Sequence, residues 1–190
     1  ITEDAPVQQP MSPYGNTKKV GEEIIRDTAK ASSINAILLR YFNPIGAHPT
    51  AAIGELPIGV PQNLVPFITQ TAIGLRQELS VFGDDYPTPD GTAVRDYIHV
   101  VDLAKAHVIA LERLLEKKNT DRVETFNLGT GTGSSVLEVI QSFERVSGQK
   151  LPYKIVPRRE GDVTEAYANT HKAFLMMRRP PRSTLDEAMA

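Results

Sequence analysis

The sequence predicts an α/β fold with parallel strands, and two observations lead to this prediction. A long amphipathic segment, residues 13–31, is followed directly by a short and nearly continuous apolar run, residues 36–41. Such a run is typical of a strand that is buried on both faces of a parallel sheet. Helix-like and strand-like segments then alternate along the rest of the chain, which is the pattern of α/β proteins.

Composition limits the kind of protein. The chain has 190 residues, 41% of them hydrophobic, with 21 basic and 23 acidic side chains and no cysteine. This suits one globular domain or parts of two. The balanced charge gives no reason to expect nucleic acid or an anionic membrane as a partner, and no apolar run approaches the ~18 residues of a membrane span. The absence of cysteine excludes thiolate chemistry and agrees with a reducing, cytoplasmic location.

The first predicted helix covers residues 13–31. Ser12 is a favoured N-cap, and Pro13 is favoured at the first helical position. We expect its buried side to carry Val20, Ile24, Ile25 and Ala29. The chain begins at Ile1 without a signal peptide pattern, and we expect it to be part of a longer protein.

An irregular segment, residues 42–62, follows the first predicted strand. Four prolines and three glycines break every periodicity there, and a structureless stretch of this length is usually functional. A helix is predicted over residues 63–78 and a strand over residues 79–82, followed by a loop over residues 84–92.

The second half of the chain repeats the alternation. Asp102 is the predicted N-cap of an amphipathic helix, and its inward side is expected to carry Leu103, Ala106, Ala110, Leu111 and Leu114. Strands are predicted over residues 123–128 and 153–156. Between them, a helix over residues 135–147 is expected to end at Gly148.

Tyr14 and Lys18 are candidate catalytic residues. They are four residues apart, so their side chains lie on one face of the predicted helix. An ammonium group beside a phenol stabilises the phenolate, which suits a general acid or base. Most pairs with this spacing are solvated surface. However, the run Ser12-Pro13-Tyr14-Gly15-Asn16-Thr17-Lys18 resembles the Tyr-x-x-x-Lys helix of the extended short-chain dehydrogenase/reductases, a nucleotide-sugar-modifying branch.

A series of further segments, in the same order, resembles the UDP-glucose 4-epimerase family within that branch. The similarity extends from about residue 11 to residue 169 and includes residues 39–49, 54–55, 63–66, 81–86, 90–92, 94–104, 126–131 and 158–162. The resemblance implies the C-terminal part of a Rossmann-type NAD-binding domain, residues 1–41, and a smaller α/β nucleotide-sugar domain, residues 42–190.

The resemblance also implies an activity for the full-length protein. NAD would remove hydride from sugar C4, the 4-keto sugar would turn over, and hydride would return to its other face. UDP-galactose and UDP-glucose would thus be interconverted in galactose metabolism, and UDP-N-acetylglucosamine and UDP-N-acetylgalactosamine are further expected substrates. The full-length enzyme would be a homodimer, and the isolated 190 residues would be inactive.

Residue roles follow from the same resemblance. Tyr14 would move the O4 proton and also contact NAD, Lys18 would bind the nicotinamide ribose, and Tyr41 and Phe42 would be further contacts to NAD. The implied substrate residues are Asn43, Asn63, Leu64, Ser80, Val81, Phe82, Arg95, Arg159, Asp162 and Ala166. They include the cations, amides and aromatic ring that a UDP-sugar requires. Taken singly, Arg95 and Asp96 would be read as a surface ion pair and Asn43 as a turn residue.

Ala166 bears on which sugars fit. In the family, the position four residues after the aspartate at 162 lines the pocket around the sugar C2 substituent, where a bulky tyrosine leaves room only for a hydroxyl. The small side chain at 166 predicts room for an N-acetyl group. The alternative is that Tyr167 fills this space.

The remaining patterns give less information about function. Residues 129–133 are glycine-rich but have Ser134 where a dinucleotide loop needs its last glycine, so we expect a turn into a helix. The four histidines lack metal-ligand spacing, and His99 is expected in a strand. Residues 170–183 depart from the family pattern and receive no function, and a final helix is expected at 184–187. Two alternative functions stay open: another NAD-dependent nucleotide-sugar dehydratase or decarboxylase, and a non-catalytic sugar-nucleotide-binding module.

Overall fold

The structure is a computed structural model that describes residues 1–10, 12–178, 181 and 183–190. It confirms the α/β class, because helices alternate with strands that pair mostly in parallel. In this part of the chain, three parallel pairs form: β1 (Ala36–Tyr41) with β6 (Val123–Leu128), β2 (Asn43–Ile45) with β5 (Tyr97–His99), and β3 (Leu79–Phe82) with β8 (Tyr153–Val156). A fourth sheet has β4 (Val94–Arg95) between antiparallel β7 (Ser134–Ser135) and parallel β9 (Glu165–Ala166).

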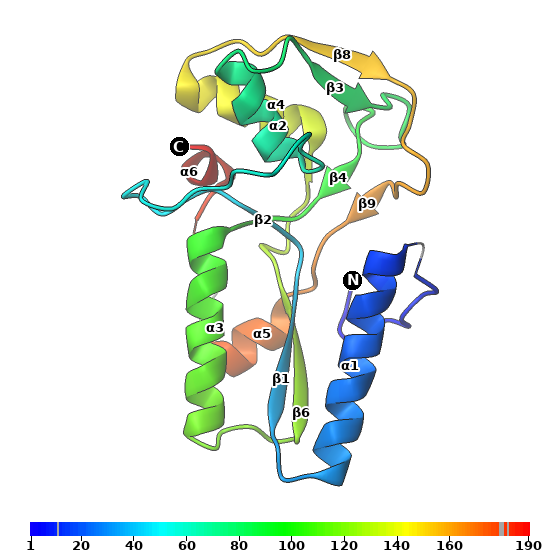
Figure 1. Cartoon of the computed structure of the whole chain (residues 1–190), viewed down its shortest axis with the longest axis vertical. Coiled ribbons are helices and arrows are strands. Elements are labelled where there is room, and N and C mark those ends of the chain that lie inside the picture. The colour runs from blue at the N-terminus through cyan, green and yellow to red at the C-terminus, as the bar shows by residue number, and fades with distance from the viewer. Residues whose placement is uncertain (11, 179–180, 182) are drawn as a thin grey trace.

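The helices divide into two groups (Figure 1). Around the β1–β6 pair lie α1 (Pro13–Ala31) on one side and α3 (Val100–Leu115) and α5 (His171–Met177) on the other. At the opposite end of the molecule, α2 (Leu64–Ala72), α4 (Val136–Ser147) and α6 (Leu185–Met189) accompany the β3–β8 pair.

Two hydrophobic cores correspond to these two groups. One core is centred on Phe126 of β6 and includes Leu103 of α3 and Ala173 of α5, with Ile37 of β1 packed against it. The other is built from residues of β2, β3, β5, α2, α4 and α6, among them Ile45, Ile68, Val81, Tyr97, Ile140 and Ala188. Strand β1 therefore shares its core with segments from the second half of the chain, and the predicted boundary at residue 41 stays a prediction.

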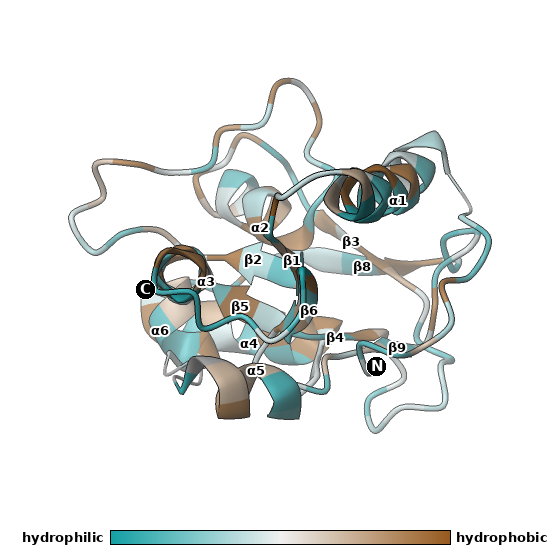
Figure 2. Ribbon diagram, turned by 90° about the horizontal axis from the view of Figure 1, so that it is seen from below, coloured by the Kyte–Doolittle hydropathy of each residue, from teal (hydrophilic) through white to brown (hydrophobic). Residues whose placement is uncertain are grey.

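The start of α1 is as predicted, but its buried side is not. The Ser12 hydroxyl accepts a hydrogen bond from the backbone N–H of Gly15, and Pro13 opens the helix. Ala29 is 1% exposed, whereas Ile24 is 60% exposed, and Val20 and Ile25 are also exposed. Figure 2 shows hydrophobic stretches along α1, and Val20, Ile24 and Ile25 stay exposed, whereas Glu22 and Arg26 of the same helix contact Arg40 and Thr125.

Two predictions for residues 42–78 are wrong in detail. The irregular segment 42–62 contains β2, which pairs with β5. The next helix ends at Ala72 instead of continuing to residue 78, because Gly74 adopts a left-handed conformation with φ of 78° and turns the chain. The strand over residues 79–82 is confirmed.

The prediction for α3 is wrong at its start and on one face. His99 ends β5, as expected for a strand residue, and its Nδ1 accepts from the backbone N–H of Val101. His99 is therefore the N-cap, and Asp102 lies in the first turn, where a carboxylate interacts favourably with the helix dipole. Leu111, expected to face inward, is 57% exposed, while Leu103 and Ala110 are buried.

The remaining elements agree with the sequence. Strands β6 and β8 have the predicted bounds. Helix α4 begins after Ser135 with a capping box and ends at Gly148, whose φ is 69°. The glycine-rich run 129–133 leads into β7 and α4 as the expected turn, and α6 follows Thr184. Within residues 170–183, positions 179, 180 and 182 lie outside the described residues.

Two kinds of feature are absent from the described residues. No helix among them is long and apolar enough to cross a bilayer. No group of three or more histidine, aspartate or glutamate side chains in the same part of the chain could hold a metal ion.

Candidate functional site

Predicted substrate residues from distant segments meet at the turn formed by residues 158–162. The backbone N–H of Asp162 donates to the Arg159 carbonyl over 3.2 Å, which closes the turn. From it, the Arg159 guanidinium lies over the ring of Phe82, 4.5 Å from the centroid, and Asp162 forms an ion pair with Arg95. One turn therefore gathers an aromatic ring from β3, a cation from β4, and a cation and a carboxylate of its own.

Arg95 is held from several sides. Its guanidinium donates to the Val94 carbonyl over 2.7 Å as well as to Asp162, and Ala166 stands opposite it in the parallel β4–β9 register. Its side chain is 18% exposed, so the cation is partly withdrawn from solvent but still reachable. The sequence alone suggested a surface ion pair between Arg95 and Asp96, but among the described residues Arg95 pairs with Asp162 instead.

Asp96 has a different role from Arg95. It is fully buried, and its Oδ1 accepts from the backbone N–H and the hydroxyl of Thr130, both over 2.7 Å. Its Oδ2 accepts from the backbone N–H groups of Gly131 and Ala168, both over 3.1 Å. Sequence reasoning missed this residue, because no pattern distinguishes a carboxylate that accepts backbone N–H groups from one that pairs with an adjacent arginine.

The next residue, Tyr97, is a buried phenol. Burial raises its pKa to about 12, against the opposing influence of Arg95, so it stays protonated at neutral pH. In the β2–β5 register Tyr97 stands opposite Asn43, and the backbone N–H of Asn43 donates to the Asp96 carbonyl over 3.0 Å. Asn43 is thus attached to the same strand segment as Arg95.

Tyr14 and Lys18 lie on one face of α1, as predicted. The Lys18 Nζ is 4.8 Å from the centroid of the Tyr14 ring, which is 72% exposed. Among the described residues, the ion pairs leave Lys18 without a carboxylate partner. The pair is therefore available for a ligand, and its catalytic role stays a prediction.

The other predicted cofactor and substrate residues differ in how accessible their side chains are to a ligand. Tyr41 is half exposed and its ring lies 6.3 Å from that of His107, while Phe42 donates its N–H to the Leu128 carbonyl. Asn63 is the N-cap residue of α2 but makes no side-chain cap hydrogen bond. Val81 is 1% exposed and packs in a core, so its side chain is not available to a ligand; Leu64 packs against the same core, and Ser80 is half-buried.

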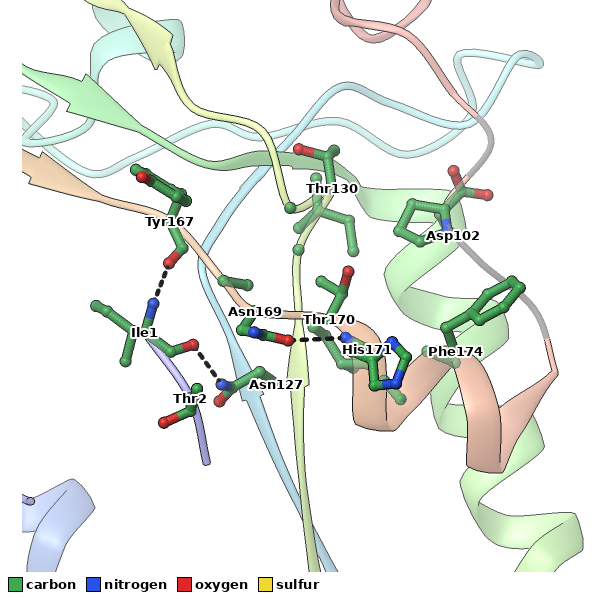
Figure 3. A pocket seen from close by; sticks show the side chains of 18 of the residues that line it. Ile1, Thr2, Asp102, Asn127, Thr130, Tyr167, Asn169, Thr170, His171 and Phe174 are labelled. Carbon is green, nitrogen blue, oxygen red and sulfur yellow. Dashed lines mark hydrogen bonds between the residues drawn. The ribbon is translucent and has the colours of Figure 1, made fainter. Parts of the chain in front are cut away.

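A separate cavity of about 850 Å³ lies between α3, the end of β6 and the segment leading into α5 (Figure 3). Its lining combines apolar side chains such as Ile109 with polar ones such as Thr130 and Asn169. Ile1 closes one side, with its carbonyl accepting from Asn127 over 2.9 Å and its N–H group donating to the Tyr167 carbonyl. None of the predicted site residues lines this cavity.

Comparison with known proteins identifies the family. The sequence model of the NAD dependent epimerase/dehydratase family matches residues 1–129. The chain belongs to this family. The match includes both the α1 pair and Arg95 but ends before the 158–162 turn.

Relatives extend the similarity within the family. The UDP-glucose 4-epimerase of Mus musculus is 59% identical over 159 residues, which is 83% of this chain and 45% of that protein. The chain thus spans about half the length of the relatives it matches.

Solved structures of family members superpose over the whole chain. The UDP-glucose-4-epimerase of Stenotrophomonas maltophila, with bound NAD and formylated UDP-arabinopyranose, has a TM-score of 0.94 at 49% identity and is covered over 55% of its length. The UDP-Glc/GlcNAc 4-epimerase of Campylobacter jejuni has a TM-score of 0.79 at 34% identity, with 56% of its length covered. The described part of this chain therefore has the architecture of slightly more than half of such an enzyme.

Proposed function

We propose that the full-length protein is a UDP-glucose 4-epimerase that interconverts UDP-galactose and UDP-glucose. The observation that carries the proposal is the gathering of Phe82, Arg95, Arg159 and Asp162 at one turn. An aromatic ring, two guanidinium groups and a carboxylate match the base, the diphosphate and the ribose hydroxyls of a UDP-sugar. Relatives named UDP-glucose 4-epimerase support the same reading.

Arg159 and Arg95 differ in the contacts that each must give up to bind a phosphate. Arg159 rests on the Phe82 ring without a carboxylate partner among the described ion pairs, so it can turn to a phosphate without breaking a salt bridge. Arg95 has to share or exchange its bond with Asp162. Asp162, released in this exchange, is then free to accept hydrogen bonds from ribose hydroxyls.

NAD would supply the hydride acceptor and donor for sugar C4. The described residues fit one end of this cofactor: Tyr14 and Lys18 are exposed and adjacent on α1, where a phenol can take and return the O4 proton and an ammonium can bind ribose hydroxyls. Tyr41, the last residue of β1, and Phe42, the next residue, are proposed to contact the same end. The described residues do not provide a glycine-rich pyrophosphate loop, since Gly129–Gly133 lead into β7 and α4.

We further propose that the sugar pocket admits an N-acetyl group. Ala166 stands beside Arg95 in the β4–β9 register, whereas Tyr167, the next residue, lines the separate cavity of Figure 3. Tyr167 lies just past the end of β9, and its ring lies beside Gly133, where an added Cβ atom would be 3.4 Å from the ring. This position argues against Tyr167 filling the space beside Ala166. A related structure, that of Campylobacter jejuni, is described as acting on both Glc and GlcNAc nucleotides.

A homodimer in the cytoplasm remains the proposed state of the full-length protein. The exposed side chains of Val20, Ile24 and Ile25 on α1 support burial against further protein, from the same or a second chain. Light scattering of the full-length protein distinguishes a monomer from a dimer.

One experiment separates the proposed activity from its rivals. The full-length protein is incubated with NAD and, in separate reactions, with UDP-galactose, UDP-glucose and UDP-glucuronic acid, and the nucleotide sugars are separated by chromatography. Formation of UDP-glucose supports the epimerase. Accumulation of a dehydrated 4-keto sugar from a UDP-hexose, or of a decarboxylated sugar from UDP-glucuronic acid, indicates a dehydratase or decarboxylase. Binding of UDP-galactose without conversion indicates a non-catalytic binding module.

A further inference from the structure

Asp96, the residue after Arg95, is hydrogen-bonded to several segments that adjoin Arg95. Its backbone N–H donates to the Ala166 carbonyl over 3.1 Å, and its own carbonyl accepts from Asn43. Its carboxylate binds the loop after β6 through Thr130 and Gly131, and the segment after β9 through Ala168. Strands β4 and β9 and the start of β2 are therefore connected through one residue that directly follows Arg95 (Figure 1).

The Asp96 carboxylate is unusual because it has no exposed surface and its described hydrogen-bond donors are all neutral. The described hydrogen bonds provide three backbone N–H groups and one hydroxyl, and no arginine or lysine pairs with it among the described ion pairs. Four neutral donors satisfy both oxygens and offset the cost of burying the charge. Such a site requires the donors to be aimed at the carboxylate from fixed backbone positions.

Gly129 shows how closely the loop after β6 approaches the Asp96 carboxylate. A Cβ atom on Gly129 would lie 2.2 Å from the Asp96 Oδ2 and 2.9 Å from the Ala168 Cβ. Only a residue without a side chain allows the backbone to come this near. The glycine is therefore required by the carboxylate, and the loop, the carboxylate and the segment at residue 168 form one tightly fitted unit.

We propose that Asp96 is a positioning residue for nucleotide-sugar binding, acting through Arg95 and Ala166 without touching the ligand. This rests on the proposed function, in which Arg95 binds the diphosphate. By holding β4 against β9, the carboxylate keeps the Arg95 guanidinium at the distance from the 158–162 turn where it meets Asp162 and, on binding, a phosphate. Loss of the carboxylate weakens the pairing of β4 with β9, so Arg95 is held less firmly and UDP binds more weakly.

A double-mutant cycle on the full-length protein tests the proposal, with UDP affinity measured by calorimetry. Asp96→Asn keeps the shape but turns an NH₂ group toward backbone donors. We expect it to weaken UDP binding about tenfold, whereas in an Arg95→Ala background the same change has almost no further effect, because residues that act through one another are not additive. Asp90→Asn is the matched control. Asp90 accepts hydrogen bonds from Thr92 and from Ser135, the N-cap of α4, and no hydrogen bond or ion pair of the described residues joins it to Arg95, so the variant leaves UDP affinity within about twofold.

The outcomes are distinct. UDP affinity of folded Asp96→Asn within twofold of the parent, or losses that add with Arg95→Ala, would overturn the positioning role. If Asp96→Asn does not fold, Thr130→Val removes one donor from the same carboxylate and must weaken UDP binding severalfold, again only when Arg95 is present. A parent protein that fails to bind UDP overturns the proposed function itself. A parent that binds UDP through Arg95 but is insensitive to both variants overturns only the inference about Asp96.

Discussion

The guanidinium of Arg159 lies over the ring of Phe82, and the adjacent Arg158 lies over the ring of Tyr86, 4.0 Å from its centroid. Two consecutive arginines thus stack on two aromatic rings, one at the end of β3 and one in the loop that follows it. They differ in one respect: Arg158 also pairs with Asp85 over 2.7 Å. Arg158 is therefore engaged with the protein, and Arg159 is the one that is available to a phosphate.

This difference gives a matched pair of variants for UDP binding. Arg159→Ala in the full-length protein is expected to weaken UDP affinity by ~1.5–3 kcal/mol, the range for hydrogen bonds to charged groups. Arg158→Ala is the control and should change UDP affinity little, because its charge is already paired. Calorimetric titration with UDP measures both. Equal losses in the two variants would show that the phosphate site does not discriminate between them.

Removal of the Tyr14 hydroxyl tests the catalytic assignment. In the full-length protein, Tyr14→Phe is expected to lower turnover of UDP-galactose by ~10²–10⁴-fold, the usual contribution of a general acid or base. UDP affinity should be nearly unchanged, because the phenol does not hold the nucleotide. Tyr153→Phe, at a half-exposed position of β8, is the control. A Tyr14→Phe enzyme with normal turnover would exclude the phenol from proton transfer.

Ala166→Tyr tests the size of the sugar pocket. The added ring should abolish turnover of UDP-N-acetylgalactosamine and spare UDP-galactose, because overpacking penalises only the ligand that needs the volume. Glu165→Tyr places the same ring one residue earlier, on the exposed side of β9, and should affect neither sugar. Turnover is followed by chromatography of the nucleotide sugars. A parent enzyme that is inactive on the N-acetyl sugar would contradict the roomy pocket.

The buried pair Arg113–Glu124 predicts a pH-dependent stability. Glu124 accepts two hydrogen bonds from Arg113, at 2.6 and 2.8 Å, and both side chains are at most 10% exposed. Glu124→Gln leaves a buried cation unpaired and should cost about 3–5 kcal/mol of unfolding free energy. Glu116→Gln, which breaks only the exposed pair with Lys118, should cost less than about 1 kcal/mol. Urea unfolding of the full-length proteins measures both.

The sign of the pH effect follows from Arg113. Its hydrogen bonds lower the pKa of Glu124 below the ordinary value of 4.5. The folded state therefore binds this proton less readily than the unfolded state, and the pair's contribution is present above pH 4.5. It is lost as pH falls through the lower pKa of the folded state. The stability difference between parent and Glu124→Gln should shrink over that acid range and stay constant near neutral pH.

Local signals predicted much of this fold. Capping at Ser12, the apolar run of β1 and the glycine stop at Gly148 depend on neighbouring residues, and the structure has them where they were expected. Predictions that depended on distant packing were less accurate. Periodicity indicates that Ile24 and Leu111 are apolar but not which segment covers them, and both are exposed.

The candidate site shows the same division. Residue types and a family resemblance were enough to select Phe82, Arg95 and Arg159, which the structure brings together with Asp162. The role of Asp96 depends on backbone groups at residues 130, 131 and 168, which arrive from other parts of the chain. Every residue except proline carries the same backbone N–H group, so the residue types at 130, 131 and 168 do not indicate that these groups converge on Asp96.

The pairing of β1 with β6 has a consequence for synthesis. Residues 36–41 align with residues 123–128 in parallel, so β1 has to wait until the ribosome has made and released most of the chain between them. At ~5–20 residues per second this interval is roughly 4–16 s. During it, the edge of β1 that pairs with β6 is open to other nascent chains. Expression should therefore be more sensitive to chaperone supply than the stability of the finished protein would indicate.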